Sequence, residues 1–373
     1  MTPIAIFAYD FPHRKTHDFL LDLMSLGCRD LLVLGAPKKD LGSLAKPRKA
    51  SDPTPVFEPL PTADLCARLG LSYVALDHQN VLQIGQHLSE RGISLGIVSG
   101  ARILSAQVIS LFSRGVVNFH PGKIPETSGL DAFFYAIKKG VAAGVTTHFV
   151  DHRVDAGRLV RFSELTIHSH DTPETVQENV YQLQRMALRE FVADVRRGNI
   201  PESPIDRPSK NSPMDELERH AAVALFPLWK AQRLVVQQQR SFFHACETGD
   251  MAALVGGLAA DPALVSIAND KGWTPLIVAC FHQRIEAVKA LLDAGADPNR
   301  CAAKGTTPLM YAKTRLLHQT SGHYPLLELL IEHGADCQRT DGAGLTVLQY
   351  VEQAGDAQLA AYIRDRAPAH KPH

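Results

Sequence analysis

The chain reads Gly115-Val-Val-Asn118-Phe-His120-Pro121-Gly-Lys-Ile-Pro125 where an apolar run meets a polar pair. Asn118 and His120 are two residues apart, and on a β-strand this spacing places both side chains on the same face. Pro121 lacks a backbone N–H, so the chain is expected to leave the sheet directly after His120. An amide and an imidazole are therefore predicted to lie together where a strand ends and a loop begins. Open α/β sheets usually place their functional sites at this edge.

Acyl transfer is the chemistry that this pair suits. An Asn side-chain N–H can stabilise a developing oxyanion, which is worth roughly 2.7–4 kcal/mol for each donor. A His can donate a hydrogen bond to the same oxygen or move a proton. Asp155 is the carboxylate expected to orient His120, because it follows the strand-like run Gly144-Val-Thr-Thr-His-Phe-Val150 inside an Asp-Ala-Gly turn. An Asn-x-His pair alone is weak evidence, since most strand histidines are ordinary core or surface residues.

The elements before this strand predict an open, mostly parallel α/β sheet. Residues 3–9 and 30–35 are apolar runs that predict buried strands, and the helical pattern between them ends at Gly27. This β-α-β start favours parallel pairing. Further strands are expected at 72–76 and 93–99, with a helix between them. No Gly-x-Gly-x-x-Gly follows the first strand, so dinucleotide binding is not predicted.

A set of short motifs follows one order along the chain. The motifs are Asn118-Phe-His120-Pro121, Pro125, Gly129, Gly144-Val-Thr-Thr and Asp155-x-Gly157. Together they resemble the folate-dependent formyltransferase family over residues 1–200, which implies a Rossmann-like catalytic domain and 10-formyltetrahydrofolate as the formyl donor. The catalytic residues that the resemblance implies are Asn118, His120 and Asp155. The resemblance also implies a loop that would hold the pterin ring, largely through backbone groups. This loop consists of Gly100, Ala101, Arg102, Ile103 and Leu104.

The sequence defines the amine that accepts the formyl group less clearly than it defines the formyl donor. Where the family often shows Ser-Leu-Leu-Pro-x-x-Arg-Gly, this chain has Gly122-Lys-Ile-Pro-Glu-Thr-Ser128-Gly129, so Ser128 replaces the Arg of the tRNA and sugar branches. By resemblance, fusions of this architecture act on nucleotide-linked amino sugars. The expected acceptor is therefore the primary amine of a small nucleotide-linked amino sugar, and a dTDP-linked amino-deoxyhexose is the first candidate. Formylation of methionyl-tRNA and hydrolysis of 10-formyltetrahydrofolate are the alternatives.

A repeat array occupies the last third of the chain. Gly272-Trp-Thr274-Pro-Leu276 recurs as Gly305-Thr-Thr307-Pro-Leu309, and Thr274 and Thr307 are 33 residues apart. This period and the Thr-Pro-Leu motif resemble ankyrin repeats, in which each unit is two short helices. A concave surface that binds a protein or a small ligand is expected, and stabilisation of the enzyme or homodimer formation is an alternative. A protein-interaction scaffold with a relic transferase domain is the rival from another functional class.

A proline-rich, polar segment indicates where the catalytic domain ends. Residues 198–215 contain several prolines, and a helical connector with Trp229 in the core is expected over 214–240. We therefore expect a catalytic domain at 1–200, a linker with a connecting helix at 201–240 and an ankyrin-repeat domain at 241–370. The basic residues of 36–62 suit a solvated loop better than a phosphate contact.

Composition narrows the class of protein further. Among 373 residues, Lys plus Arg and Asp plus Glu number 39 each, so the chain has no net charge that would favour nucleic acid. The six cysteines form no C-x-x-C pair, and His168-Ser-His170 has no third ligand placed by sequence, so no metal site is expected. No basic leader or long apolar segment is evident. A cytoplasmic enzyme without a membrane span is the resulting expectation.

Overall fold

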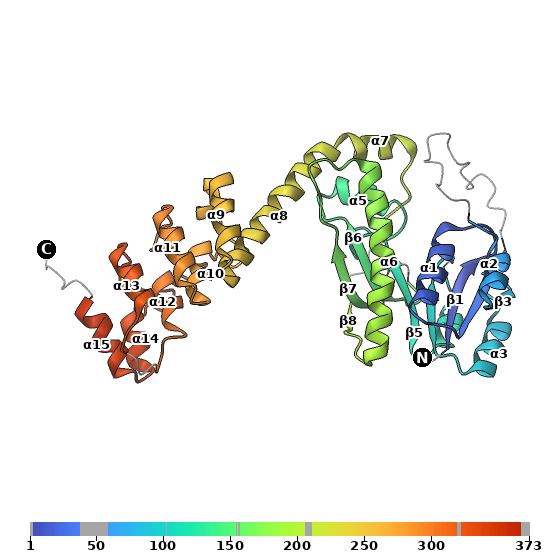
Figure 1. Ribbon diagram of the computed structural model, residues 1–373, viewed down its shortest axis with the longest axis horizontal. Helices are drawn as coiled ribbons and strands as arrows, with labels where there is room; N and C mark the ends of the chain where they lie inside the picture. Colours follow the sequence, from blue (N-terminus) through green and yellow to red (C-terminus); the bar gives the residue numbers. More distant parts are fainter. Residues whose placement is uncertain are drawn as a thin grey trace. The chain divides into compact units, whose positions relative to one another are not determined.

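The structure is a computed structural model that describes residues 3–37, 59–101, 103–153, 155, 157–205, 211–318 and 322–366. Its contacts divide the chain into two units, Met1–Arg233 and Leu234–His373 (Figure 1). The division falls inside helix α8 (Phe226–Thr248), and the domain limits expected from the sequence stay predictions. Arg102 and most of the basic loop at 36–62 lie outside the described residues.

The first unit is built on one sheet, which has eight strands among the described residues in the order β3-β2-β1-β4-β5-β6-β7-β8. The strands are β1 (Ile4–Tyr9), β2 (Leu31–Ala36), β3 (Ser72–Ala75), β4 (Leu95–Val98), β5 (Gly115–His120), β6 (Gly144–Phe149), β7 (Arg158–Glu164) and β8 (Ser203–Pro204). Pairing is parallel from β3 to β5 and antiparallel from β5 to β8. The predicted mostly parallel α/β fold is confirmed, and β5, which bears the Asn-x-His pair, lies where the direction of pairing changes.

Helices cover both faces of this sheet. They are α1 (Arg14–Ser25), α2 (Thr62–Leu69), α3 (Val81–Arg91), α4 (Ala106–Ser110), α5 (Ala132–Lys138) and α6 (Pro173–Arg197). Figure 1 shows α1 and α6 side by side on the near face, where the ring of Phe119 packs against Phe19 and Phe191. On the other face, Val116 joins a core cluster with side chains of α3 and α4. Because strand side chains alternate, Asn118 and His120 share the face of Val116 and not that of Phe119.

The connector differs from the single helix expected over 214–240. It forms two helices, α7 (Glu216–Ala224) and α8, separated at Leu225. Pro227 has no N–H to donate, so it is tolerated in the first turn of α8 but would break a continuous helix. Trp229 is buried as predicted, and its indole N–H donates to the Val141 carbonyl at 2.8 Å. The start of α8 is thereby fixed to the first unit.

The second unit consists of short helices. They are α9 (Met251–Ala260), α10 (Pro275–Phe281), α11 (Ile285–Asp293), α12 (Pro308–Lys313), α13 (Pro325–Glu332), α14 (Val347–Gln353) and α15 (Ala357–Arg366), with a 3-10 turn at Pro262–Ser266. The repeated threonines Thr274, Thr307 and Thr346 are the N-caps of α10, α12 and α14. Each hydroxyl oxygen accepts a backbone N–H of the first turn, which explains why the threonine recurs.

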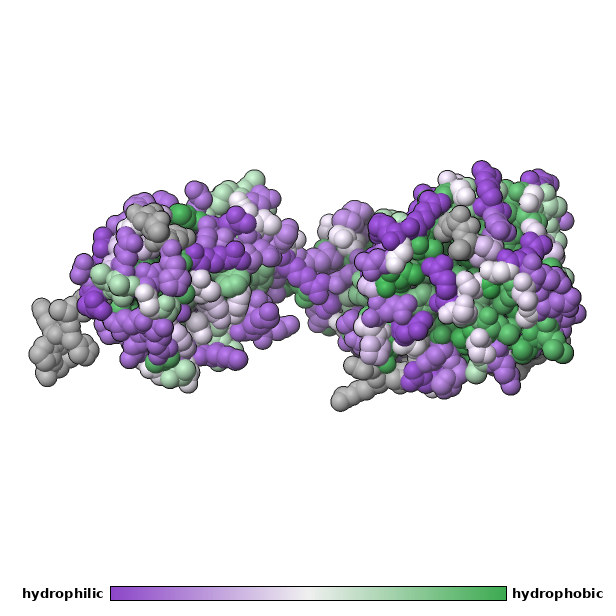
Figure 2. All heavy atoms as spheres, turned by 90° about the horizontal axis from the view of Figure 1, so that it is seen from below, coloured by the Kyte–Doolittle hydropathy of each residue, from purple (hydrophilic) through white to green (hydrophobic). Residues whose placement is uncertain are grey.

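Surface character differs between the units. On the face drawn in Figure 2, the ankyrin-type unit is mostly hydrophilic, whereas the sheet-containing unit shows a wider apolar area. None of the helices in the described part of the chain is long and apolar enough to cross a membrane.

Candidate active site

His120 is held between two acceptors at the end of β5. Its Nδ1 lies 3.3 Å from Oδ2 of Asp155, and its Nε2 lies 2.9 Å from the backbone oxygen of Thr127. The side chain is buried, with 4% of its surface exposed. Only a ring that carries both protons can donate to both acceptors at once. The surroundings therefore suit a histidine that holds or passes a proton.

Asp155 reaches His120 from a sharp turn after β6. Its backbone is in the left-handed region, with φ of 47°, a conformation that Asp and Asn tolerate better than most residues. Oδ2 also accepts the backbone N–H of Gly129 at 2.5 Å. Burial alone would raise the pKa of this carboxyl, but the hydrogen bond and charge of His120 and the Gly129 N–H lower it below its usual value. Asp155 is consequently a carboxylate at neutral pH.

Asn118 precedes His120 on the same strand face. It pairs across the sheet with His148 of β6, and its Nδ2 lies 3.4 Å from His148 Nε2. Asn118 as a whole is half-buried. The structure thus brings the three predicted catalytic residues together: His120 and Asp155 are in direct contact, and Asn118 is their neighbour along β5.

The loop after β5 is anchored beneath this pair. The Thr146 hydroxyl donates to the Gly122 carbonyl at 2.6 Å and accepts the Ile124 N–H at 3.2 Å. A Cβ at Gly122 would stand 2.2 Å from Oγ1 of Thr127 and 3.1 Å from Nε2 of His120. Only glycine fits this close approach, and the loop consequently keeps the Thr127 carbonyl in contact with the imidazole.

The predicted donor-binding loop follows β4. Gly100 donates its N–H to the Phe7 carbonyl at 3.0 Å, and a Cβ there would lie within 2.9 Å of Tyr9 and His13. Ala101 is half-buried, Leu104 joins the core, and Ile103 has 61% of its surface exposed. Arg102 is outside the described residues. Donor binding by this loop remains a prediction.

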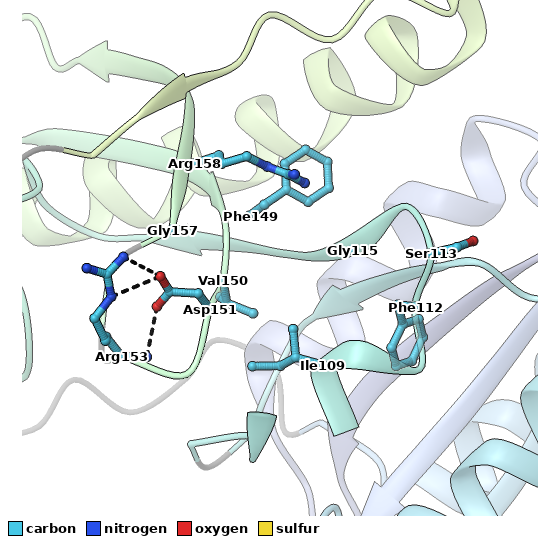
Figure 3. Close-up of a pocket in the computed structure, with 10 residues that line it drawn as sticks. All are labelled: Ile109, Phe112, Ser113, Gly115, Phe149, Val150, Asp151, Arg153, Gly157 and Arg158. Atoms are coloured by element: carbon cyan, nitrogen blue, oxygen red, sulfur yellow. Dashed lines mark hydrogen bonds and ion pairs between the residues drawn. The ribbon is translucent and has the colours of Figure 1, made fainter. Parts of the chain in front are cut away.

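A pocket of about 410 Å³ lies beside the turn that carries Asp155 (Figure 3). Its lining residues are Ile109, Phe112, Ser113, Gly115, Phe149, Val150, Asp151, Arg153, Gly157 and Arg158. Figure 3 shows Ile109 and Phe112 on one side and the hydrogen-bonded Asp151–Arg153 pair on another, with Val150 next to Asp151. Burial acts to raise the pKa of Asp151, but the hydrogen bonds and charge of Arg153 lower it. The pocket therefore combines an apolar wall with fixed opposite charges next to the Asp155 turn.

Two side chains at this site were missed by the sequence analysis. His148 lies opposite Asn118, and strand alternation from Thr146 could have indicated it. Lys15 of α1 lies with its Nζ 3.4 Å from the Phe119 carbonyl, a contact between positions 104 apart in sequence that no local pattern reveals. Burial lowers the pKa of Lys15 to about 8, although Asp155 opposes that shift. Burial and the charge of Lys15 lower the pKa of the neighbouring His13 to about 4.

The two histidines considered as metal ligands stack on one another. The rings of His168 and His170 lie 5.5 Å apart, with an angle of 9° between their planes. Within the described residues, no group of three or more His, Cys, Asp or Glu is arranged to hold a metal ion.

Comparison with known proteins identifies two parts of the chain. Residues 26–192 match the formyl transferase family model, and residues 242–341 match the model for ankyrin repeats in three copies. A phosphoribosylglycinamide formyltransferase from Bacillus subtilis (strain 168) is 31% identical over 84 residues, which are 22% of this chain and 43% of the relative. A methionyl-tRNA formyltransferase from Halothermothrix orenii is 26% identical over 147 residues, or 39% of this chain and 46% of the relative.

Solved structures are also similar to this chain. A sugar N-formyltransferase from Shewanella sp FDAARGOS_354 aligns with a TM-score of 0.41 and 17% identity, and covers 60% of this chain and 87% of that one. The chain spans about half the length of the curated relatives named above, 43% and 46% respectively.

Proposed function

We propose that this chain, which carries a formyl transferase domain and ankyrin repeats, moves a formyl group from 10-formyltetrahydrofolate to a primary amine. The observation that carries this proposal is the contact between His120 and the ionised Asp155 at the end of β5, two residues after Asn118. An amide can donate to the oxyanion of acyl transfer, and an imidazole oriented by a carboxylate can move the proton.

The donor supplies the formyl group, and two features of the chain support a place for its heterocycle. The pocket of about 410 Å³ beside the Asp155 turn is within the usual size of small-molecule sites. Ile109 and Val150 offer an apolar wall, and the Asp151–Arg153 pair offers fixed polar groups. The exposed Ile103 and the backbone of Gly100 and Leu104 belong to the loop that we propose for the same ligand.

Each catalytic residue has a separate task in this proposal. The neutral amine forms a bond to the formyl carbon, and the formyl oxygen becomes negative as its double bond opens. Asn118 Nδ2 donates a hydrogen bond to that oxygen, and the Nε2–H of His120 exchanges its contact with the Thr127 carbonyl for one with the same oxygen, which stabilises the oxygen most when its charge is greatest. Asp155 holds His120 in place and assists transfer of the amine proton toward the departing folate nitrogen. The old carbon–nitrogen bond breaks, and the formyl group remains on the acceptor.

A nucleotide-linked amino sugar is the acceptor that we propose first. The resemblance of the fused architecture to sugar-modifying fusions supports it. The equal numbers of acidic and basic residues, 39 each, give no general attraction for tRNA. Methionyl-tRNA formylation remains the second candidate, because a relative with that name matches 39% of this chain. Hydrolysis of the donor would use Asn118, His120 and Asp155 with water in place of the amine. The cytoplasmic location and the homodimer also stay predictions.

A mass-spectrometric formylation assay tests the function. The full chain and 10-formyltetrahydrofolate are incubated with dTDP-, UDP- and GDP-linked amino sugars, glycinamide ribonucleotide and methionyl-tRNA. A gain of one formyl group on a nucleotide sugar is the expected result, and formylation of another amine would move the assignment to that acceptor. Folate release without a formylated product would favour hydrolysis. Absence of both turnover and folate binding would favour the scaffold alternative.

A further inference from the structure

A short segment before α7 is bound to the loop that follows the catalytic histidine. Asn211 Nδ2 donates to the backbone oxygen of Ser128 at 2.8 Å and to that of Glu126 at 3.1 Å. The backbone N–H of Asn211 donates to the Ser128 oxygen as well, at 3.2 Å. Ser128 and Glu126 flank Thr127, whose carbonyl contacts the ring of His120. One residue far along the chain thus holds both sides of the part of the loop that contacts His120.

The orientation of the Asn211 amide is fixed by a lysine. Lys139, which follows α5, lies with its Nζ 2.6 Å from Oδ1 of Asn211 and 2.6 Å from the Glu126 carbonyl. An ammonium group can only donate, so the amide oxygen must face Lys139 and the amide nitrogen must face the two loop carbonyls. The oxygen accepts once and the nitrogen donates twice, which uses both N–H groups of the side chain.

The residues after Asn211 are held against α5. Tyr135 donates its hydroxyl to the Ser212 carbonyl at 2.9 Å, and the Met214 N–H donates to Asp131 at 2.9 Å. Met214 is buried, and α7, which follows it, packs against α5 (Figure 1). Residues 211–214 are therefore fixed to the catalytic domain along their length, and Asn211 presents its amide to the loop from a defined position.

The peptide group that Asn211 holds is the one that contacts the catalytic carboxylate. The carbonyl of Ser128 and the N–H of Gly129 belong to a single peptide group, and that N–H donates to Oδ2 of Asp155 at 2.5 Å. Because a trans peptide is planar, its carbonyl and its N–H point in opposite directions, and fixing one fixes the other. Two hydrogen bonds to the carbonyl also polarise the group, which makes its N–H a stronger donor. Asn211 and Asp155 are thus the two partners of one peptide.

We propose that Asn211 is a positioning residue of the transfer site, which holds the peptide between Ser128 and Gly129 so that its N–H stays on Asp155 and Asp155 stays on His120. This inference rests on the proposed formyl transfer. Asn211 acts through the backbone of the loop, and no bond is made or broken at its side chain.

Loss of the Asn211 amide has a consequence for the charge of Asp155. The hydrogen bond from Gly129 is one of the interactions that lower the pKa of this carboxyl, and weakening it should raise that pKa. The titratable groups around the carboxylate are His120, His148 and Lys15 of α1, and a change at position 211 leaves them in place. Since the carboxylate form is the active one, the acidic limb of the pH profile of kcat should move to higher pH.

The test compares Asn211→Asp, Asn211→Ala and Asn211→Gln with a control, Ser212→Ala. Aspartate has the size of Asn, but its oxygens only accept, so one of them would face the loop carbonyls. Glutamine carries the same groups on a longer side chain. Ser212 is exposed, and the contact described above uses its backbone carbonyl. Formyl transfer to one acceptor is measured over a pH series, together with melting temperatures.

We expect Asn211→Asp and Asn211→Ala to lower kcat roughly 10- to 100-fold with little change in KM, because a small displacement of a catalytic group can cost about 10² in rate. Their acidic limb should lie at higher pH than that of the wild type, and Asn211→Gln should retain more of kcat. Ser212→Ala should match the wild type in kcat and in its pH profile. Folded Asn211 variants with the kcat and acidic limb of the wild type would overturn the inference.

Hydrogen exchange tests the contact without turnover. Mass spectrometry of peptides that cover residues 123–131 reads the exchange of the Gly129 amide. This exchange should be faster in Asn211→Ala than in the wild type and in Ser212→Ala, and equal rates would overturn the inference. If the wild type formylates no amine, the proposed function fails instead, and the exchange measurement still decides whether Asn211 holds this peptide.

Discussion

Asp155 Oδ2 lies 3.3 Å from His120 Nδ1 and at the same time accepts the Gly129 N–H at 2.5 Å. One carboxylate oxygen thus joins the end of β5 to the loop that follows it and to the turn after β6. The imidazole cannot rotate without losing this contact or the one with Thr127. Geometry of this kind places the histidine before a substrate arrives, which is the condition for effective proton transfer and oxyanion stabilisation.

Replacing Asp155 by Asn should remove the charge while preserving the turn. Asn tolerates the left-handed backbone at φ 47°, and its amide oxygen can still accept the Gly129 N–H. We expect kcat to fall roughly 10²–10⁴-fold, because a positioned acid–base group usually contributes a factor of this size to the rate. Steady-state kinetics measure the fall, and circular dichroism reports whether the fold is retained. A folded variant with the wild-type kcat would exclude the proposed role of Asp155.

Asn118→Ala should lose transition-state stabilisation with little effect on binding. If the Asn118 amide donates to the developing oxyanion, its removal should cost about 10²–10³-fold in kcat, or about 2.7–4 kcal/mol. KM for both substrates should change little, because the negative oxygen exists only during the reaction. Kinetics at saturating donor measure the two parameters separately. A rise in KM with kcat unchanged would show that Asn118 binds the ground state instead.

Several elements of the fold followed directly from local sequence. Thr172 caps α6 and Pro173 begins it, which is the order that these two residue types favour at the start of a helix. The Thr-Pro repeats begin α10 and α12 for the same reason. Asn118 and His120 could be predicted to share a face, since strand alternation is a local property. The sheet was also expected to be mostly parallel, because its first elements alternate between strands and helices.

Contacts between residues far apart in the sequence are harder to predict from it. The antiparallel strands β7 and β8 carry no regular apolar pattern, and the partly exposed Arg158–Glu164 run owes its place to pairing with β6. Lys15 of α1 lies 3.4 Å from the Phe119 carbonyl, which stands beyond Val117, the last residue of β5 that pairs with β4. Asp155 was selected by the motif, but its contact with Gly129 depends on two turns that meet only in the folded chain. Neither relationship leaves a trace in sequence spacing.

Two adjacent glycines in α9 provide a matched stability test. A Cβ at Gly256 would meet no atom within 4 Å, whereas one at Gly257 would lie 2.8 Å from the buried ring of Phe242. Gly256→Ala should stabilise the second unit by about 0.5–1 kcal/mol, since alanine favours a helix over glycine. Gly257→Ala gains the same preference but overpacks the core, at a cost of about 1–3 kcal/mol. Urea unfolding of both variants measures the difference, and equal midpoints would contradict the packing described.

Asp22 should contribute stability that depends on pH. Its buried carboxylate accepts from Arg185 at 2.8 and 2.9 Å and from Arg189 at 2.5 Å. Burial would raise the pKa of Asp22, but the two guanidinium groups lower it below its usual value. Because the folded pKa is the lower one, this contribution is complete above the unfolded pKa of about 3.9 and is lost as the pH falls through the folded value.

Asp22→Asn should therefore destabilise the first unit at pH 7 by about 1–3 kcal/mol, since two guanidinium groups lose their charged acceptor and both are partly solvated. The difference from the wild type should shrink as the pH falls below about 4, where the wild-type carboxyl also becomes neutral. Urea unfolding at pH 7 and at acidic pH measures both effects, with Asp293→Asn as a surface control that should leave the midpoint unchanged. If the difference in unfolding free energy between Asp22→Asn and the wild type stays constant on acidification, Asp22 contributes through its packing and not through its charge.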